Sequence, residues 1–217
     1  HRVDPAADLV VVGNPTNPTC VLHPCRSLEA LRAPHRVVVV DEAFMDAVPG
    51  ESESLVGDDM TGLLVLRSLT KTWGLAGLRA GYVVGDPALV ARLAALQPHW
   101  SVNSLATVAM EQVSTPAALA EAAQAARVTA QWREHLATGL RRLGLRPQDS
   151  TAPFVLVEVG AGVREALRGK GYAARRGDTF PGLGPQWLRL AVRDPLTTAG
   201  LLRDRAAAIV DQVERSV

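Results

Sequence analysis

The run Val37–Val40 consists of four consecutive valines and is followed at once by an acidic residue, Asp41. Branching at Cβ favours extended backbone. An uninterrupted apolar run, unlike an alternating one, indicates a strand that is covered on both faces, as in parallel sheets flanked by helices. We therefore expect an α/β structure built on a mostly parallel sheet.

Other short apolar runs along the chain also end in polar loops. Leu9–Val12 leads into GNPTNPTC (Gly13–Cys20), where two Asn-Pro steps force extended or turn geometry on the asparagines. Leu63–Leu66 and Ala80–Val84 flank a glycine-containing loop. Because ligands in α/β sheets lie at the carboxyl ends of strands, we expect these loops to form a site.

Lys71 lies in the loop between the last two runs, and it is one of only two lysines among 23 basic residues. Arginine keeps its proton and does not condense with an aldehyde, whereas the amine of a lysine can. The nearby hydroxyl of Ser68 and guanidinium of Arg79 suit a phosphate group. These neighbours favour covalent chemistry for Lys71 over the alternative, a solvated surface lysine.

The composition limits the partners of the chain. A length of 217 residues with 47% hydrophobic content allows one large or two small domains with a real core. The net charge of +1, without a basic run interleaved with aromatics, argues against nucleic-acid and membrane-surface partners. Cys20 and Cys25 flank His23, but no second ligand cluster follows, so we expect reduced thiols in a cytoplasmic protein and no metal site.

Two domains are expected, residues 1–143 and 144–217, with GLRPQDS (Gly144–Ser150) as the linker at the start of the second. Hydrophobic periodicity and capping residues predict the elements of both parts. The expected helices and later strands are Asp86–Leu96 with Asp86 as N-cap, a helical region Ser104–Leu143 broken at Pro116, strand Phe154–Val159, helix Val163–Arg168, strand Leu188–Val192 and a helix after Pro195.

Three motifs in order carry a family resemblance: NPTNPT (Asn14–Thr19), DEAF (Asp41–Phe44), and SLTK (Ser68–Lys71) with GLRAGY (Gly77–Tyr82). In this combination the chain resembles the class I/II aminotransferases, over nearly its whole length. The resemblance implies the aspartate aminotransferase fold, type I, with pyridoxal 5'-phosphate as cofactor. The chain would then supply a partial large domain, with a mostly parallel sheet, and a small C-terminal α/β domain.

The resemblance also implies a role for each residue in the motifs. Asn17 matches the asparagine that hydrogen-bonds the phenolic oxygen of the cofactor, and Asp41 the carboxylate that keeps the pyridine nitrogen protonated. Lys71 matches the lysine that binds the cofactor covalently and then moves the proton. Ser68 and Arg79 match ligands of the cofactor phosphate.

Within that family, DEAFMD, LRSLTK, HWSVNSLA and the segment Arg175–Arg193 are similar to the threonine-phosphate decarboxylases of cobalamin biosynthesis, whose sister group is the histidinol-phosphate aminotransferases. This implies a small phosphorylated amino acid as substrate. Arg175, with Arg176 as a one-residue register alternative, would bind its distal phosphate and Arg189 its carboxylate. Asn103 would face the substrate. Decarboxylation is the first expectation and histidinol-phosphate transamination the alternative.

The sequence departs from the family pattern in two places. Cys20 stands where the commonest motif has glycine, so we expect the turn there to be made differently. Phe44 stands where many members have tyrosine, which would leave Asn17 as the main ligand of the phenolic oxygen.

Family members are longer, and their leading part supplies further cofactor contacts. We therefore expect this chain to be a C-terminal portion of such an enzyme. It would act as a homodimer or together with a complementing N-terminal fragment. A catalytically silent folded fragment is the alternative.

Overall fold

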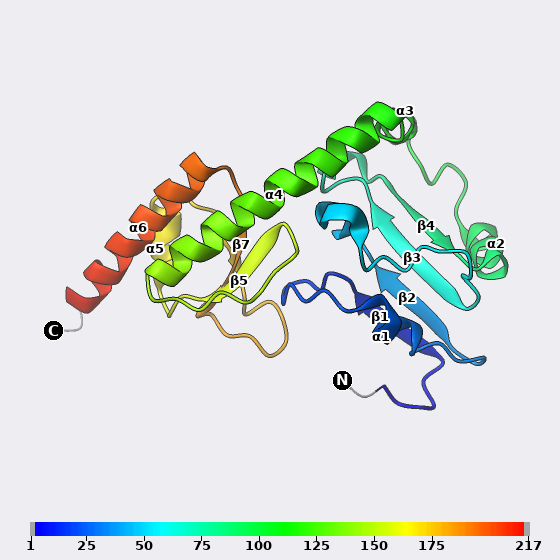
Figure 1. Ribbon diagram of the computed structural model, residues 1–217, viewed down its shortest axis with the longest axis horizontal. Coiled ribbons are helices and arrows are strands. Elements are labelled where there is room, and N and C mark those ends of the chain that lie inside the picture. The colour runs from blue at the N-terminus through cyan, green and yellow to red at the C-terminus, as the bar shows by residue number, and fades with distance from the viewer. Residues whose placement is uncertain (1–2, 215–217) are drawn as a thin grey trace. The chain divides into compact units, whose positions relative to one another are not determined.

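The computed structural model describes residues 3–214 and, among these, the side chains up to residue 204 (Figure 1). The chain divides into two compact units. The first comprises the residues up to Asn17 together with Leu22–Arg127, and the second comprises Pro18–Val21 together with the residues from Val128 onward. This division falls inside helix α4 (Pro116–Arg142), whereas the boundary expected from the sequence, between residues 143 and 144, lies beyond it and remains a prediction.

The first unit contains a four-stranded sheet in the order β1-β2-β3-β4 (Figure 1). The three parallel strands β1, β2 and β3 are followed by an antiparallel β4, so the expectation of a mostly parallel sheet is confirmed. All four strands lie where the apolar runs predicted them. Their bounds are β1 (Leu9–Gly13), β2 (Val37–Asp41), β3 (Leu63–Ser68) and β4 (Gly81–Gly85).

The two faces of β2 differ in burial. Val38 and Val40 are fully buried and pack with Val65 and with Leu28 of α1 (Cys25–Glu29), whereas Val37 and Val39 are only half-buried. Complete coverage of both faces, expected from the valine run, is therefore only partly realised in the described structure.

Two helices of the first unit, α2 (Pro87–Leu96) and α3 (Ser104–Val113), begin at capping residues. The Asp86 carboxylate accepts hydrogen bonds from the backbone N–H groups of Ala88 and Leu89, and Pro87 opens α2, as the sequence predicted. Asn103 caps α3 in the same way. The remaining bounds are those of the 3-10 turns η1 (Met45–Ala47), η2 (Pro49–Glu51) and η3 (Ala76–Leu78).

The second unit contains an antiparallel sheet in the order β5-β7-β6, and two further helices. Their bounds are β5 (Phe154–Glu158), α5 (Val163–Gly169), β6 (Arg175–Arg176), β7 (Trp187–Ala191) and α6 (Pro195–Glu214). Residues alternate between the faces of a strand. Val155, Val157, Leu188 and Leu190 lie on one face of this sheet and form a core with side chains of α4 and α5, such as Leu136, Leu140 and Leu167.

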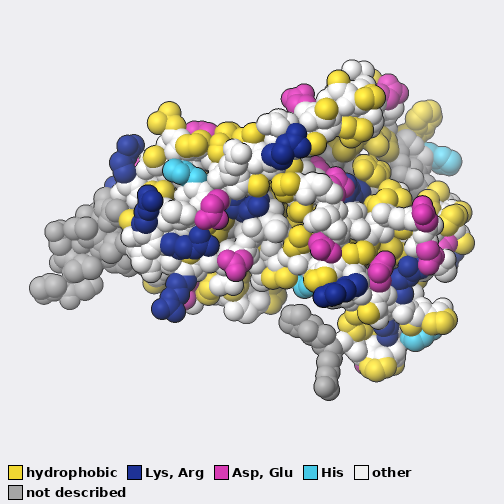
Figure 2. All heavy atoms as spheres, in the orientation of Figure 1, with side chains coloured by type: hydrophobic (Ala, Val, Ile, Leu, Met, Phe, Trp, Pro, Cys, Tyr) yellow, Lys and Arg dark blue, Asp and Glu magenta, His cyan; other side chains and the backbone are white. Residues whose placement is uncertain are grey.

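Charge and hydropathy of the surface agree with the composition. Basic and acidic side chains lie interspersed over the face drawn in Figure 2, consistent with the net charge of +1. Among the helices that the structure describes, none combines the length and apolar character needed to cross a lipid bilayer.

Close packing at the end of β4 gives a test of the sheet. A Cβ atom added to Gly85 would lie 2.4 Å from the Leu63 carbonyl oxygen, too close for any side chain. We expect Gly85→Ala to lower the free energy of unfolding by about 1–3 kcal/mol through overpacking. Gly57→Ala is the control, because a Cβ there meets nothing within 4 Å. Denaturant unfolding should show the control within about 0.5 kcal/mol of wild type, and equal stability of both variants would contradict the register of β3 and β4.

Candidate functional site

The carboxyl ends of β1, β2 and β3 lie at one edge of the sheet. Gly13 pairs with Asp41, and Asp41 pairs with Leu66, two residues before the end of β3. The antiparallel β4 begins at this same edge, since Ser68 pairs with Gly81. The loops at this edge carry the five residues that the sequence singled out for the cofactor: Asn17, Asp41, Ser68, Lys71 and Arg79.

Asp41 and the loop after β1 are held by backbone contacts. The Asp41 side chain is exposed and accepts a hydrogen bond from the Ala43 N–H at 3.0 Å. Asn14, which the sequence analysis did not single out, is fully buried, and its amide bonds the backbone of His23 and of Glu53. Asn14 therefore fixes the Asn-Pro loop, and the exposed Asn17 follows it.

Ser68 is joined by a second hydroxyl. The Oγ of Ser68 and the Oγ1 of Thr70 lie 2.9 Å apart at the end of β3, and Thr70 is buried. Thr70 was not predicted as a ligand, although its hydroxyl follows that of Ser68 by two residues in SLTK. Two adjacent hydroxyls at a strand end suit the oxygens of a phosphate.

Lys71 is exposed, and its Nζ lies 5.6 Å from the centroid of the Phe44 ring. A cation at this distance over an aromatic face is attracted by the ring. Phe44 belongs to the loop after β2, three residues beyond Asp41, so this contact brings the loops after β2 and β3 together.

Arg79 has a left-handed backbone, with φ of 57°, and its NH1 group donates to the Ala76 carbonyl at 3.0 Å. Left-handed conformations are uncommon outside glycine, and residues that hold them cluster at functional sites. The Arg79 side chain is otherwise exposed at the same edge of the sheet.

Asn103 has a structural role in the described unit. Its Oδ1 accepts the Ala106 N–H at 2.9 Å and its Nδ2 donates to the Leu78 carbonyl at 3.1 Å. Both ends of the amide are therefore used to cap α3 and to tie it to the loop before Arg79. The substrate contact expected from the resemblance remains a prediction.

Arg175 and Arg189 lie directly opposite each other on β6 and β7 of the second unit. The guanidinium of Arg189 lies 4.5 Å from the centroid of the Phe154 ring, and that of Arg175 lies 5.4 Å from the centroid of Phe180. Burial lowers the pKa of Arg189, and the positive charge of Arg175 lowers it further. Like charges directly opposite across a sheet repel, so this pair suits an anion.

Arg176, the register alternative, faces the other way. It pairs with Leu188, whose side chain lies in the core beside α5, and its guanidinium bonds both oxygens of Asp178. The structure therefore places Arg175, and not Arg176, on the face of the sheet that carries Arg189.

Cys20 corrects one expectation from the sequence. A turn different from the glycine form was expected there. Cys20 instead adopts the left-handed backbone that suits glycine, with a φ of 67°. Its side chain is buried in the second unit, where the thiol donates weakly to the carbonyls of Pro18 and Phe154. Burial raises the pKa of the Cys20 thiol. The buried sulfur therefore belongs to a residue in the left-handed conformation, which costs a non-glycine residue about 1 kcal/mol or more.

An ionic cluster that was not foreseen from the sequence lies at the ends of β2 and β3, and Glu42 is its buried member. Arg67 pairs with Glu42 at 2.9 Å and also with Glu51. Asp46 accepts a hydrogen bond from the Thr72 hydroxyl, and burial raises the pKa of Asp46. The four charged side chains, without Thr72, line a cavity of about 230 Å³ together with Trp73, Tyr82 and residues of α3 and α4.

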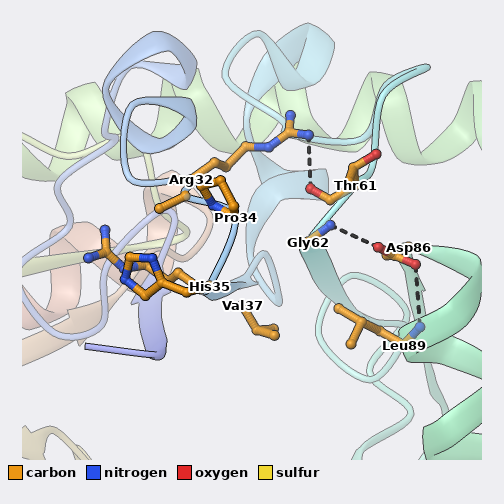
Figure 3. A pocket seen from close by; sticks show the side chains of 10 residues that line it. Arg32, Pro34, His35, Val37, Thr61, Gly62, Asp86 and Leu89 are labelled. Atoms are coloured by element: carbon orange, nitrogen blue, oxygen red, sulfur yellow. Dashed lines mark hydrogen bonds between the residues drawn. The ribbon is translucent and has the colours of Figure 1, made fainter. Parts of the chain in front are cut away.

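A wider hollow, of about 610 Å³, lies at the opposite ends of the strands (Figure 3). Its polar groups are bonded to one another: Arg32 donates to the Thr61 carbonyl at 2.9 Å, and the Gly62 N–H donates to Asp86 at 2.9 Å. It lies at the amino ends of β2 and β3, so it is separate from the edge that carries Lys71.

Comparison with known proteins identifies the family. The family model described as aminotransferase class I and II matches residues 2–208. The chain belongs to this family. Its members depend on pyridoxal 5'-phosphate, the cofactor that the motifs predicted, and this places the chain in a family of cofactor-dependent enzymes.

Curated relatives of the chain are named histidinol-phosphate aminotransferases. The histidinol-phosphate aminotransferase of Mycobacterium bovis is 53% identical over 190 residues, which cover 86% of this chain and 52% of that protein. Histidinol-phosphate aminotransferase 2 of Ralstonia nicotianae is 35% identical over 225 residues, 95% of this chain and 56% of that protein. The chain thus spans about half the length of these curated relatives.

Solved structures confirm the predicted type I fold. A double mutant of the Thermus thermophilus aspartate aminotransferase has a TM-score of 0.79 at 26% identity, over 94% of this chain and 58% of that one. The L-threonine-O-3-phosphate decarboxylase of Porphyromonas gingivalis has a TM-score of 0.74 at 24% identity, over 92% of this chain and 64% of that one. The second likeness concerns the fold alone.

The residues of this aminotransferase-family chain fit the cofactor. One edge of the sheet presents an exposed carboxylate at Asp41, an exposed amine at Lys71 and an exposed guanidinium at Arg79, next to the hydroxyl pair of Ser68 and Thr70. A ring nitrogen that carries a proton, an aldehyde and a phosphate need this set of groups.

The pKa of Asp46 leads to a prediction about stability. Because the folded pKa is raised, the folded protein holds this proton more tightly than the unfolded chain. Asp46 should therefore lower the free energy of unfolding progressively as pH rises from about 4, the unfolded value, through its folded pKa. Asp46→Asn removes this penalty, so the variant should gain stability relative to wild type across that pH range.

Unfolding by denaturant at a series of pH values measures this difference. Asp58→Asn, at an exposed position, is the matched control. A constant difference between Asp46→Asn and wild type from pH 4 to 7 would show that Asp46 is not the group responsible.

Proposed function

We propose that the protein is a pyridoxal-phosphate-dependent aminotransferase that acts on a small phosphorylated amine, with histidinol phosphate ahead of threonine phosphate. Relatives named histidinol-phosphate aminotransferase, at 53% identity over 86% of the chain, support this order. It reverses the order expected from the sequence motifs, which favoured the decarboxylase.

The opposed arginines Arg175 and Arg189 carry the substrate part of the proposal. Their Cα positions are paired across β6 and β7, so the two guanidinium groups project from the same face. Histidinol phosphate has no carboxylate, and both arginines can then serve one phosphate. Arginine donates bidentate, charge-assisted hydrogen bonds to phosphate, and a dianion offsets the repulsion between the two cations.

The first unit supplies the cofactor contacts. Ser68, Thr70 and Arg79 would donate to the phosphate, while the Asp41 carboxylate would face a protonated ring nitrogen. Asn17 would donate to the phenolic oxygen, as the resemblance implies. Phe44 lies beside Lys71 and contributes a ring where a tyrosine hydroxyl would otherwise lie.

Lys71 has the chemical role in the proposed reaction. When bound, the cofactor acts as an electron sink for the bond that breaks at the substrate α-carbon. The amine of Lys71, once free, removes the proton from the α-carbon and returns one as the reaction continues. A primary amine suits both steps, because it accepts a proton and donates it again.

Threonine-phosphate decarboxylation is the second candidate. Phe44 and the HWSVN segment, which resemble the decarboxylase branch, favour it. Threonine phosphate carries two anionic groups, so Arg175 would bind the phosphate and Arg189 the carboxylate. Release of carbon dioxide from threonine phosphate, compared with amino transfer from histidinol phosphate to a 2-oxo acid, separates the two candidates.

Lys71→Arg tests the covalent role. The substitution keeps the positive charge but removes the reactive amine, so a borohydride-trapped cofactor adduct should be lost while the unfolding midpoint changes little. The visible spectrum with added pyridoxal phosphate and the intact mass report the adduct. A trapped adduct in Lys71→Arg would place the covalent site elsewhere, and none in wild type would favour a catalytically silent chain.

Arg175→Ala tests the substrate contact. Loss of a charge-assisted contact should weaken the phosphorylated substrate by about 2 kcal/mol, roughly thirtyfold in KM, and its unphosphorylated analogue far less. Arg176→Ala is the matched control, because its side chain lies on the opposite face and bonds Asp178. Equal losses for both compounds, or a larger loss in the control, would show that Arg175 does not bind the phosphate.

A further inference from the structure

Two side-chain bridges join the segment after β2 to the carboxyl end of β3 and to the loop that follows it. In the first bridge, Arg67 donates to Glu42 at 2.9 Å, and Glu42 is completely buried. Glu42 directly follows Asp41, and Arg67 directly precedes Ser68. This ion pair therefore links the residue beside the proposed ring-nitrogen partner to the residue beside the proposed phosphate ligand.

The Glu42–Arg67 bridge is fully satisfied. Glu42 also accepts hydrogen bonds from the Ser54 hydroxyl at 2.8 Å and from the Leu55 N–H at 2.7 Å. Burial alone would lower the pKa of Arg67, but Glu51 and Glu42 raise it above its ordinary value. Buried pairs of this kind contribute little net stability, and their best-supported effect is to fix one arrangement.

The second bridge lies next to the reactive lysine. The hydroxyl of Thr72, the residue after Lys71, donates to the Asp46 carboxylate. Two residues before Asp46, the ring of Phe44 lies under the Lys71 ammonium. One loop therefore meets the other at two consecutive positions, through Phe44 with Lys71 and through Asp46 with Thr72.

The environment of Asp46 makes the bridge a defined contact. Burial raises the pKa of Asp46, and the bond from Thr72 acts in the opposite direction. Its other oxygen, Oδ1, is buried and has no hydrogen-bond partner among the described residues. A carboxyl group held in this way has few alternative donors, so Thr72 fixes its orientation and is fixed by it.

We propose that Asp46 and Thr72 are positioning residues that set the direction of the Lys71 amine toward the cofactor aldehyde. This inference rests on the proposed function. Covalent attachment joins the Lys71 nitrogen to the aldehyde carbon and releases the aldehyde oxygen as water. The rate of that step depends on the approach of the amine, and a misplacement of about 1 Å costs on the order of a hundredfold.

Thr72→Val removes the donor hydroxyl with almost no change of shape, and Thr72→Ser keeps it. We expect Thr72→Val to slow covalent attachment of pyridoxal phosphate to Lys71 by at least about tenfold, as measured by borohydride trapping over time and intact mass. Thr72→Ser should restore the rate to within about twofold of wild type. Thr61→Val, at an exposed threonine at the amino end of β3, is the control and should have no effect.

Non-covalent binding separates positioning from general damage. In the Lys71→Arg background, adding Thr72→Val should leave the dissociation constant of the cofactor unchanged, because the phosphate and ring contacts lie elsewhere. Asp46→Ala removes the acceptor instead of the donor, and it should slow attachment as Thr72→Val does. It is the second variant if Thr72→Val does not fold.

The outcomes are distinguishable. A wild-type rate in Thr72→Val, or an equal weakening of non-covalent binding, overturns the positioning role while the proposed function stands. No Lys71 adduct in wild type overturns the proposed function and this inference together. Slow attachment in Thr72→Val and Asp46→Ala, with rescue by Thr72→Ser, supports the inference.

Discussion

The parallel register of β1, β2 and β3 is the constraint on which the site depends. Parallel strands end at the same edge, so three loops that are distant in the sequence become neighbours there. β4 runs antiparallel and starts at that edge, so the loop after β3 leads directly into β4 without a crossover. The backbone thereby gathers a carboxylate, hydroxyls, an amine and a guanidinium before any side-chain contact forms.

In the second unit, two arginines of like charge lie opposite each other. Arg175 and Arg189 face one another across neighbouring strands, and each guanidinium lies over an aromatic ring, Phe180 or Phe154. Aromatic faces attract cations without neutralising them. The rings therefore help to hold two like charges next to one another on one face of the sheet.

Much of this could be read from the sequence because strand ends and caps are local signals. The valine run of β2, the cap at Asp86 and the break before α4 were all placed correctly. The buried Glu42–Arg67 pair was not foreseen, because 25 residues separate its partners and charged residues are usually exposed. Thr70 and Cys20 were missed or misjudged since burial and left-handed backbone depend on packing rather than on local pattern.

The short segment Pro18–Val21 belongs to the second unit although the first unit surrounds it in the sequence. The chain therefore passes between the units three times, near residues 17, 21 and 127. The smaller unit is consequently not a contiguous stretch of sequence. A fragment made only of the residues from Val128 onward would lack Pro18–Val21, and with it the contact of Cys20 with the Phe154 carbonyl. Recombination between relatives that exchanges only the C-terminal half would separate this piece from its packing partners, so the Asn-Pro loop and the small unit must vary together.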